Sequence, residues 1–210
     1  MKKKLSEYGQ YKHDIFAKLN FNFTPKSKIL NLGCGDGEDS VILRDFYDLN
    51  VSNCDIYRHE NIDKFKLDFD LAGIYDLPYK SESFDYIFLH DVLHHIDEET
   101  QNYDKHIAGL TEAIRVLKPG GKVIIVEGNR YNPLFYPHMV KMLGHEHFKQ
   151  SYFKKIINDS YKNYEIQFNF FECHAYPKYQ VWFWKIFEYI MEKFVPAQFL
   201  AYNIAIITKK

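Results

Sequence analysis

The sequence predicts an α/β protein built on a doubly wound, mostly parallel sheet. Short apolar runs alternate along the chain with stretches that have helical patterns. The apolar runs are continuous, which is typical of strands buried on both faces. Helices that connect such strands cover both faces of a parallel sheet. The length fits one domain, or one domain with a cap, and we expect a single domain over residues 1–210.

The expected elements follow from these runs and from the residues that interrupt them. Seven strands are expected at 28–33, 50–54, 64–69, 84–90, 121–127, 164–171 and 200–208. Six helices are expected at 6–20, 38–47, 91–97, 102–117, 150–160 and 179–194. Pro25 separates the first helix from the first strand, and the Pro-Gly-Gly sequence at 119–121 ends the 102–117 helix.

The two halves of the chain differ in aromatic content. Of the 37 Phe, Tyr and Trp residues, 21 follow residue 127, including both tryptophans. We expect residues 1–127 to form a cofactor-binding half and residues 128–210 a substrate-side half with a lid or cover helix. In this interpretation the aromatic half shapes a pocket for an apolar or aromatic substrate. The alternative is that these side chains only fill the core.

Composition and charge argue against several kinds of partner. Fractions of 46% hydrophobic and 26% charged residues are typical of soluble globular proteins, and a net charge of −1 gives no general attraction to nucleic acid. The three cysteines form no CxxC pair, which fits a reducing cytoplasm. The N-terminus lacks the apolar core of a signal peptide, and charges interrupt residues 181–207, so no membrane span is expected. The expected partner is a small-molecule substrate, and the chain is expected to be a monomer or homodimer.

The most informative motif is ILNLGCGDGEDS at residues 29–40. An apolar run ends in three glycines at alternate positions, Gly33, Gly35 and Gly37, and helix-compatible residues follow. Glycines allow a sharp turn with positive φ and leave no Cβ in the way of a ligand. The helix that follows directs free N–H groups at the turn. The motif therefore predicts a strand–turn–helix site for a nucleoside-type cofactor.

An acid at the end of the second strand indicates how such a cofactor is held. Asp55 lies 22 residues after Gly33, and its two oxygens suit the two hydroxyls of a ribose. A nicotinamide cofactor favours G-x-G-x-x-G, but the last position of that pattern falls on Glu38. The observed G-x-G-x-G spacing instead favours S-adenosylmethionine, which has no pyrophosphate to bind.

Four segments, in order, resemble one known family. They are ILNLGCGDG, VSNCDI, LPYKSESFDYIFLHDVLHHI and LTEAIRVLKPGGKVIIVEG, and together they cover about residues 28–128. With them the chain resembles the class I S-adenosylmethionine-dependent methyltransferases, of the small-molecule subgroup that includes the quinone and sterol C-methyltransferases. The resemblance implies a Rossmann-like, seven-stranded sheet with an antiparallel last strand. It also implies transfer of a methyl group from S-adenosylmethionine to a small molecule.

The resemblance further implies a set of cofactor-binding residues. They are Asn31, Gly33, Cys34, Gly35, Gly37, Asp55, Ile56, Asp70, Leu71 and His90. The glycines would pass beneath the amino-acid and ribose portions, Asp55 would hold the ribose hydroxyls, and Ile56 would lie against the adenine. Asp70 and Leu71 would lie at the adenine edge. His90 would approach the methionine part and the methyl group.

One position departs from the family pattern. The family usually has Asp or Glu where this chain has Asn31. Asparagine can accept a hydrogen bond but brings no charge to the ammonium group of the cofactor. A protein that binds S-adenosylmethionine or S-adenosylhomocysteine without catalysis is therefore an alternative. A nicotinamide-dependent oxidoreductase is another, which the glycine spacing disfavours.

Histidines are the candidates for proton transfer. A general base is needed only if the acceptor arrives protonated, and histidine titrates near neutrality. His95 is the candidate base, with His90 closer to the cofactor and His94 pointing elsewhere because adjacent residues cannot share a helix face. The alternative for His95 is a capping or packing role. We expect no metal site, since no carboxylate and cysteine set at ligand spacing accompanies these histidines. In the GHEH segment at 144–147, neighbouring residues on one helix would point different ways, so no metal site is expected there either.

Overall fold

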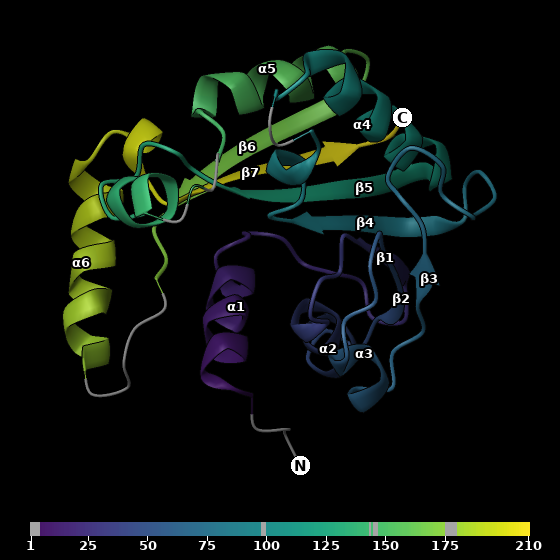
Figure 1. Ribbon diagram of the computed structural model, residues 1–210, viewed down its shortest axis with the longest axis horizontal. Helices are drawn as coiled ribbons and strands as arrows, with labels where there is room; N and C mark the ends of the chain where they lie inside the picture. Colours follow the sequence, from purple (N-terminus) through teal and green to yellow (C-terminus); the bar gives the residue numbers. More distant parts are fainter. Residues whose placement is uncertain (1–4, 98–99, 143, 145–146, 175–179) are drawn as a thin grey trace.

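The structure, a computed structural model, describes residues 5–97, 100–142, 144, 147–174 and 180–210. These residues form one seven-stranded sheet with the strand order β3-β2-β1-β4-β5-β7-β6. Helices lie on both faces of the sheet, with α4 and α5 on one side and α1, α2 and α3 on the other (Figure 1). The predicted doubly wound α/β architecture is therefore confirmed.

The element bounds agree with most of the predicted ranges. The strands are β1 (Lys28–Leu32), β2 (Asn50–Asp55), β3 (Asp70–Leu71), β4 (Phe84–His90), β5 (Leu117–Gly128), β6 (Glu165–Phe171) and β7 (Tyr202–Thr208). The α-helices are α1 (Glu7–Ala17), α2 (Glu38–Asp45), α3 (Asn61–Lys64), α4 (Tyr103–Val116), α5 (Gln150–Ser160) and α6 (Val181–Phe194). Shorter pieces are the 3₁₀-helices Leu93–His95 and Ala197–Phe199 and the π-helix Tyr136–Met142.

Strand direction and order position a crevice. β1, β2, β3, β4 and β5 pair in parallel, whereas β7 pairs antiparallel with both β5 and β6, as expected for the last strand. The chain builds β1, β2 and β3 outward and then returns to place β4 beside β1. At such a reversal the connections leave in opposite directions, which opens a ligand-sized crevice at the carboxyl ends of the strands.

The core has one layer on each face of the sheet. Successive side chains of a strand point to opposite faces, and β1 shows this directly. Ile29 belongs to the cluster that includes Ile15 of α1, whereas Leu30 belongs to the cluster that includes Leu110 of α4 and Phe153 of α5. All five side chains are fully buried. The continuous apolar run of β1 is therefore explained by burial on both faces.

The strand expected at 64–69 is wrong. α3 ends at Lys64, and Lys66 has a positive φ of 54°, which breaks an extended conformation. Phe65 and Leu67 pack against Ile62 in a small separate cluster. These side chains cover α3, and their segment does not join the sheet. The strand β3 therefore begins only at Asp70.

The helix expected at 91–97 is also wrong, because only the 3₁₀-helix Leu93–His95 forms. Asp91 has a φ of 54°, so the chain turns sharply at the end of β4. The backbone N–H groups of Val92 and Leu93 then donate to the Glu127 carboxylate, at 3.0 and 2.6 Å. A buried side chain of β5 thus binds the amides that would begin a helix.

The C-terminal helix α6 lies at one end of the sheet (Figure 1). Its only fully buried positions are Glu188 and Met191, while Trp182 and Phe194 are 68% and 70% exposed. The Glu188 carboxylate anchors it through an ion pair with Lys18 at 3.0 Å. The expected start of this helix at 179 lies outside the described residues. Among the helices that the structure describes, none is long and apolar enough to cross a membrane.

Candidate functional site

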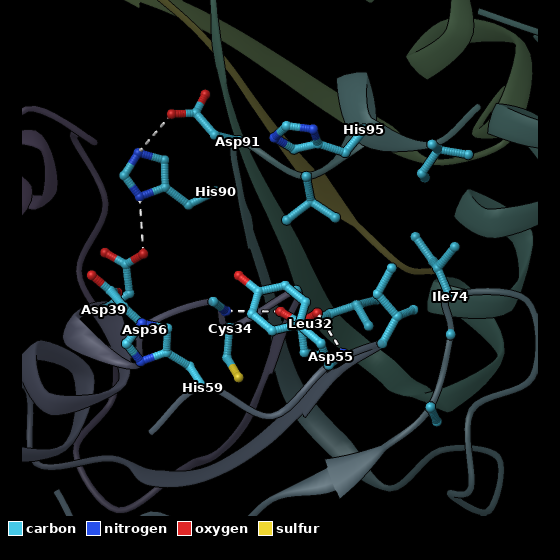
Figure 2. Close-up of a pocket in the computed structure, with 18 of the residues that line it drawn as sticks. Leu32, Cys34, Asp36, Asp39, Asp55, His59, Ile74, His90, Asp91 and His95 are labelled. Atoms are coloured by element: carbon cyan, nitrogen blue, oxygen red, sulfur yellow. Dashed lines mark hydrogen bonds and ion pairs between the residues drawn. The ribbon is translucent and has the colours of Figure 1, made fainter. Parts of the chain in front are cut away.

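A cavity of about 810 Å³ lies at the carboxyl ends of β1, β2 and β4, where the strand order reverses (Figure 2). The structure brings most of the predicted site residues to this cavity. Those that line it are Gly33, Cys34, Gly35, Asp55, Ile56, His90 and His95. The segments that carry them are far apart in the sequence, and the sheet topology alone places them side by side.

The glycine turn after β1 forms the floor of the cavity. Gly33 has a φ of 74°, and a Cβ added there would lie 2.4 Å from Cγ2 of Val92, so no side chain fits. Gly35 has a φ of 51°, but a Cβ there would meet only the Tyr57 hydroxyl at 3.9 Å. The two glycines therefore have different structural roles. Gly33 permits close packing, while Gly35 leaves its backbone open to a ligand.

Asp55 stands at the end of β2 with its carboxylate beside the glycine turn. Its Oδ2 accepts a hydrogen bond from the N–H of Gly35 at 2.8 Å, and Oδ1 accepts one from Tyr57 N at 3.4 Å. The side chain is largely buried, yet it lines the cavity. Next to it Ile56 is 76% exposed, so it is available to a ligand.

Two residues predicted to lie at the adenine edge, Asp70 and Leu71, fall outside the cavity lining. The cavity is bounded instead by Ala72, Gly73 and Ile74. Leu71 is exposed outside the cavity, and Asp70 accepts a hydrogen bond from the Tyr79 hydroxyl at 2.8 Å. Since β3 ends at Leu71, the chain enters the crevice only with the next residue. The misplaced strand at 64–69 accounts for this difference.

Asn31 and Gly37 support the site from beneath without lining it. Asn31 is buried in β1 and donates from Nδ2 to the Ser40 hydroxyl at 2.7 Å, and that hydroxyl in turn donates to Asn53. Gly37 is the N-cap of α2 with a φ of 80°, and a Cβ there would lie 2.7 Å from Cδ1 of Leu67. Asn31 therefore helps fix how α2 packs against the sheet, and Gly37 allows the start of α2 to pack closely against Leu67.

A buried charge cluster next to the turn could not be anticipated from the motif. Lys12 of α1 forms ion pairs with Asp36 at 3.0 Å and with Asp39 at 3.2 Å. The Asp39 carboxylate also contacts Nδ1 of His90 at 3.1 Å, as Figure 2 shows. All four residues line the cavity. The sequence does show one sign of this cluster, which is the acid Asp39 in the first turn of the helix after the glycines.

Within this cluster the pKa values of Asp39, Lys12 and His90 are shifted toward the charged form. Burial alone would raise the pKa of Asp39, but Lys12 and His90 outweigh it and hold that pKa well below its ordinary value. Burial would lower the pKa of Lys12, yet Asp39 and Asp36 raise it. For His90 burial is likewise outweighed by Asp39 and by Asp91, so its pKa is raised.

The two adjacent histidines after β4 differ in burial, although their ring centroids are only 4.0 Å apart. His95 is exposed and lines the cavity. His94 is buried, and its Nδ1 lies 2.8 Å from the Glu127 carboxylate. Figure 2 shows His95 and His90 on either side of Asp91 at the same end of the cavity.

The cavity lining carries an excess of negative charge. Its carboxylates are Asp36, Asp39, Asp55, Asp91 and Asp97, and its only lysine or arginine among the described residues is Lys12. All described lining residues fall between Tyr8 and Asp97. The aromatic half of the chain, expected to shape the substrate pocket, therefore adds no described side chain to this cavity.

Comparison with known proteins gives a family match in the same part of the chain that lines the cavity. Residues 30–125 match a family model described as a methyltransferase domain. The 27-O-demethylrifamycin SV methyltransferase of Amycolatopsis mediterranei is 29% identical over 108 residues, which are 47% of this chain and 37% of that protein. The chain thus spans less than half the length of this curated relative.

Two solved structures have a similar fold over nearly the whole chain. Phosphoethanolamine N-methyltransferase 2 of Haemonchus contortus, in complex with S-adenosyl-L-methionine, matches with a TM-score of 0.62 and 17% identity, covering 96% of this chain and 52% of that one. A SAM-dependent methyltransferase from Archaeoglobus fulgidus matches with a TM-score of 0.65 and 16% identity, covering 98% and 95%. The likeness is of fold.

Proposed function

We propose that this chain is a class I S-adenosylmethionine-dependent methyltransferase that transfers the methyl group to a small-molecule acceptor. The reaction is an in-line displacement at an already activated sulfonium methyl, so the bound cofactor supplies the chemical driving force. The contribution of the protein is to align and desolvate the two partners.

The observation that most supports this proposal is the pairing of Gly35 with Asp55. The backbone at Gly35 faces open space, and the Asp55 carboxylate beside it offers two acceptor oxygens. We propose that Asp55 holds the ribose hydroxyls and that Ile56 packs against the adenine. Gly33 and Cys34 complete the floor, and Ala72 to Ile74 form the adenine edge.

The excess of carboxylates in the cavity suits the charge of the cofactor. S-adenosylmethionine carries a sulfonium and an ammonium, both positive near neutral pH. Asn31 brings no charge and lies beneath the cavity, whereas Asp36 and Asp39 line it together with their ion-pair partner Lys12. We propose that this wall attracts the methionine end, with His90 held next to it by Asp39.

The acceptor is proposed to enter beside His95. His95 is the candidate base for an acceptor that arrives protonated, and Val92 and Ile96 supply apolar lining next to it. This lining supports an apolar or aromatic acceptor. Residues 1–127 would then line the cavity, and 128–210, whose described side chains lie outside it, would cover the acceptor side as part of a single domain that acts as a monomer or homodimer. The three cysteines are buried free thiols, which supports a reducing, cytoplasmic setting.

The proposal is tested by calorimetric titration of the purified chain with S-adenosylmethionine, S-adenosylhomocysteine and NAD. We expect saturable binding of the first two and none of NAD. Incubation with radiolabelled S-adenosylmethionine and a panel of phenols, hydroxylated polyketides and amines then measures turnover.

The outcomes separate the alternatives. Binding without turnover of any acceptor in the panel favours the non-catalytic module that Asn31 left open. Binding of NAD in place of S-adenosylmethionine favours an oxidoreductase and overturns the proposal. His95→Ala is expected to lower turnover by about 100-fold or more if His95 is the base, with cofactor affinity unchanged.

A further inference from the structure

Three side chains that could ligate a metal ion meet behind the turn after β4. Asp91, His94 and His147 each place one ligand atom within 4.8 Å of the other two. The rings of His94 and His147 have centroids 4.5 Å apart. Sequence reading found no such set because His147 follows β5, far along the chain from the other two. We propose that these three residues bind one divalent transition-metal ion such as Zn²⁺.

Asp91 is held rigidly at the carboxyl end of β4. Its backbone has a φ of 54°, and its N–H donates to Val126 O at 2.9 Å. Its Oδ1 accepts a hydrogen bond from Gly128 N at 2.8 Å. The Asp91 side chain is 35% exposed and lines the cavity. Asp91 therefore joins the proposed metal position to the proposed acceptor end of the cavity (Figure 2).

His94 has the support that a metal-binding histidine requires. Its Nδ1 lies 2.8 Å from Oε2 of Glu127, which is fully buried. When Nδ1–H donates to a carboxylate, the lone pair of the neutral ring is on Nε2, the atom that would ligate. Carboxylates that orient metal-binding histidines in this way are a recurrent part of metal sites. Oε1 of Glu127 accepts from Val92 and Leu93, so the carboxylate is itself fixed.

His147 is fitted into a space that a glycine provides. It is only 6% exposed, and a Cβ at Gly128 would lie 2.9 Å from the Nδ1 and Cε1 atoms of its ring. The next residue, Phe148, accepts a hydrogen bond from Arg130 N at 3.0 Å and forms a bridge with Asn129. These contacts place the histidine over the end of β5. Positions 145 and 146 of the GHEH segment lie outside the described residues.

The donor set indicates which ions would bind. Two imidazoles and one carboxylate suit Zn²⁺ and other first-row divalent ions better than Mg²⁺ or Ca²⁺. In a tetrahedral zinc site the ligand atoms are about 3.3 Å apart, so small side-chain movements would close the observed spacing. Three protein ligands leave one position for water or for an oxygen of a bound molecule. This inference is independent of methyl transfer, since the ion can bind whether or not the chain is catalytic.

The test measures metal binding directly. The chelator-treated full chain is titrated with Co²⁺, followed by its visible absorption, and with Zn²⁺ by calorimetry. We expect one ion per chain, with Zn²⁺ displacing Co²⁺. His94→Ala, His147→Ala and Asp91→Asn should each weaken binding at least tenfold, and Glu127→Gln should weaken it by about 10- to 100-fold although it removes no ligand.

Control variants test whether the ion binds at the proposed cluster. His13→Ala removes a histidine of α1 outside the cluster and should leave the affinity unchanged. Asp91 is partly exposed, so Asp91→Asn remains informative if either buried histidine variant fails to fold by circular dichroism. The inference is overturned if the wild type shows no saturable binding. It is equally overturned if Asp91→Asn and His147→Ala bind as the wild type does, or if His13→Ala abolishes binding.

Discussion

Asp55 is the residue on which the proposed cofactor site depends most directly. Asp55→Ala removes both acceptor oxygens from the cavity while leaving β2 and its neighbours in place. We expect S-adenosylmethionine to bind about 10- to 100-fold more weakly, as for loss of a charged hydrogen-bonding group. Calorimetry measures the affinity, and circular dichroism checks the fold. Asp48→Ala, which removes an exposed carboxylate paired with Lys26, is the matched control. Unchanged affinity in Asp55→Ala would refute the ribose assignment.

The buried cluster around Asp39 makes stability depend on pH. The pKa of Asp39 in the folded chain is lowered by Lys12 and His90 despite burial, whereas in the unfolded chain it is about 3.9. Because the folded pKa is the lower one, the stabilisation is fully present above about pH 4 and is lost as the pH falls through the folded pKa. Asp39→Asn should lower the free energy of unfolding by about 3 kcal/mol at pH 7.

Urea denaturation at pH 7, 5 and 3.5 measures this effect. The difference between wild type and Asp39→Asn should shrink at the lowest pH. Asp48→Asn should show a small difference at every pH, because its ion pair with Lys26 is exposed. A difference for Asp39→Asn that stays constant with pH would show that the carboxylate charge is not what stabilises the fold.

At the scale of elements, the turn between β1 and α2 allows two glycines to be separated by experiment. Gly33→Ala should lose about 2–5 kcal/mol of stability, because its Cβ would collide with Val92 and its φ is positive. Gly35→Ala has open space, so we expect a loss of only about 1–2 kcal/mol. That methyl group would instead occupy the floor of the cavity, and cofactor binding should suffer.

Thermal denaturation and calorimetry on both variants provide the two readouts. Gly120→Ala, at a φ of 75° with no atom within 4 Å of the added Cβ, measures the backbone strain alone. Equal loss of stability in all three variants would contradict the packing role of Gly33. Wild-type cofactor affinity in Gly35→Ala would contradict the binding role of the turn.

The sequence predicts an element well when the pattern that identifies the element lies within its own residues. β1, β4 and α5 were found because their apolar periodicity is local, and the α5 bounds agree to the residue. The segment 64–69 was misassigned because its aromatic side chains cover α3, which periodicity cannot reveal. Residues 91–97 read as helical, but Glu127, a residue of another strand, binds their first amides.

In the candidate site, too, residues within the motif were predicted and residues from distant elements were not. Gly35 and Asp55 were predicted from spacing within one motif and its following strand. Lys12 was not, because it reaches Asp36 and Asp39 from a helix that precedes the motif. His147 was set aside for a similar reason, since only the folded chain brings it to His94. Sequence patterns do not reveal contacts between elements that are far apart in the chain.

At the scale of the whole molecule, ligand binding should be visible as thermal stabilisation. A ligand at 100 times its dissociation constant adds about 2.7 kcal/mol to the folded state. For a chain of this length that corresponds to a rise in the unfolding temperature of about 5–10 °C. We expect this rise with S-adenosylmethionine and no rise with NAD. A scanning fluorescence experiment measures it, and stabilisation by NAD alone would contradict the cofactor assignment.

If the chain transfers methyl groups as proposed, its acid-rich cavity has a consequence for the exchange of cofactor. Methyl transfer converts a sulfonium into a neutral thioether, so the spent cofactor has one positive charge fewer than the fresh one. A wall that carries Asp36, Asp39 and Asp91 would attract the fresh form more strongly than the spent form, which keeps the ammonium but has lost the sulfonium charge. Under the proposed function, this difference in charge favours release of the spent cofactor and its replacement by the fresh one. Because mobile ions screen this attraction, the preference for fresh over spent cofactor should narrow as ionic strength rises.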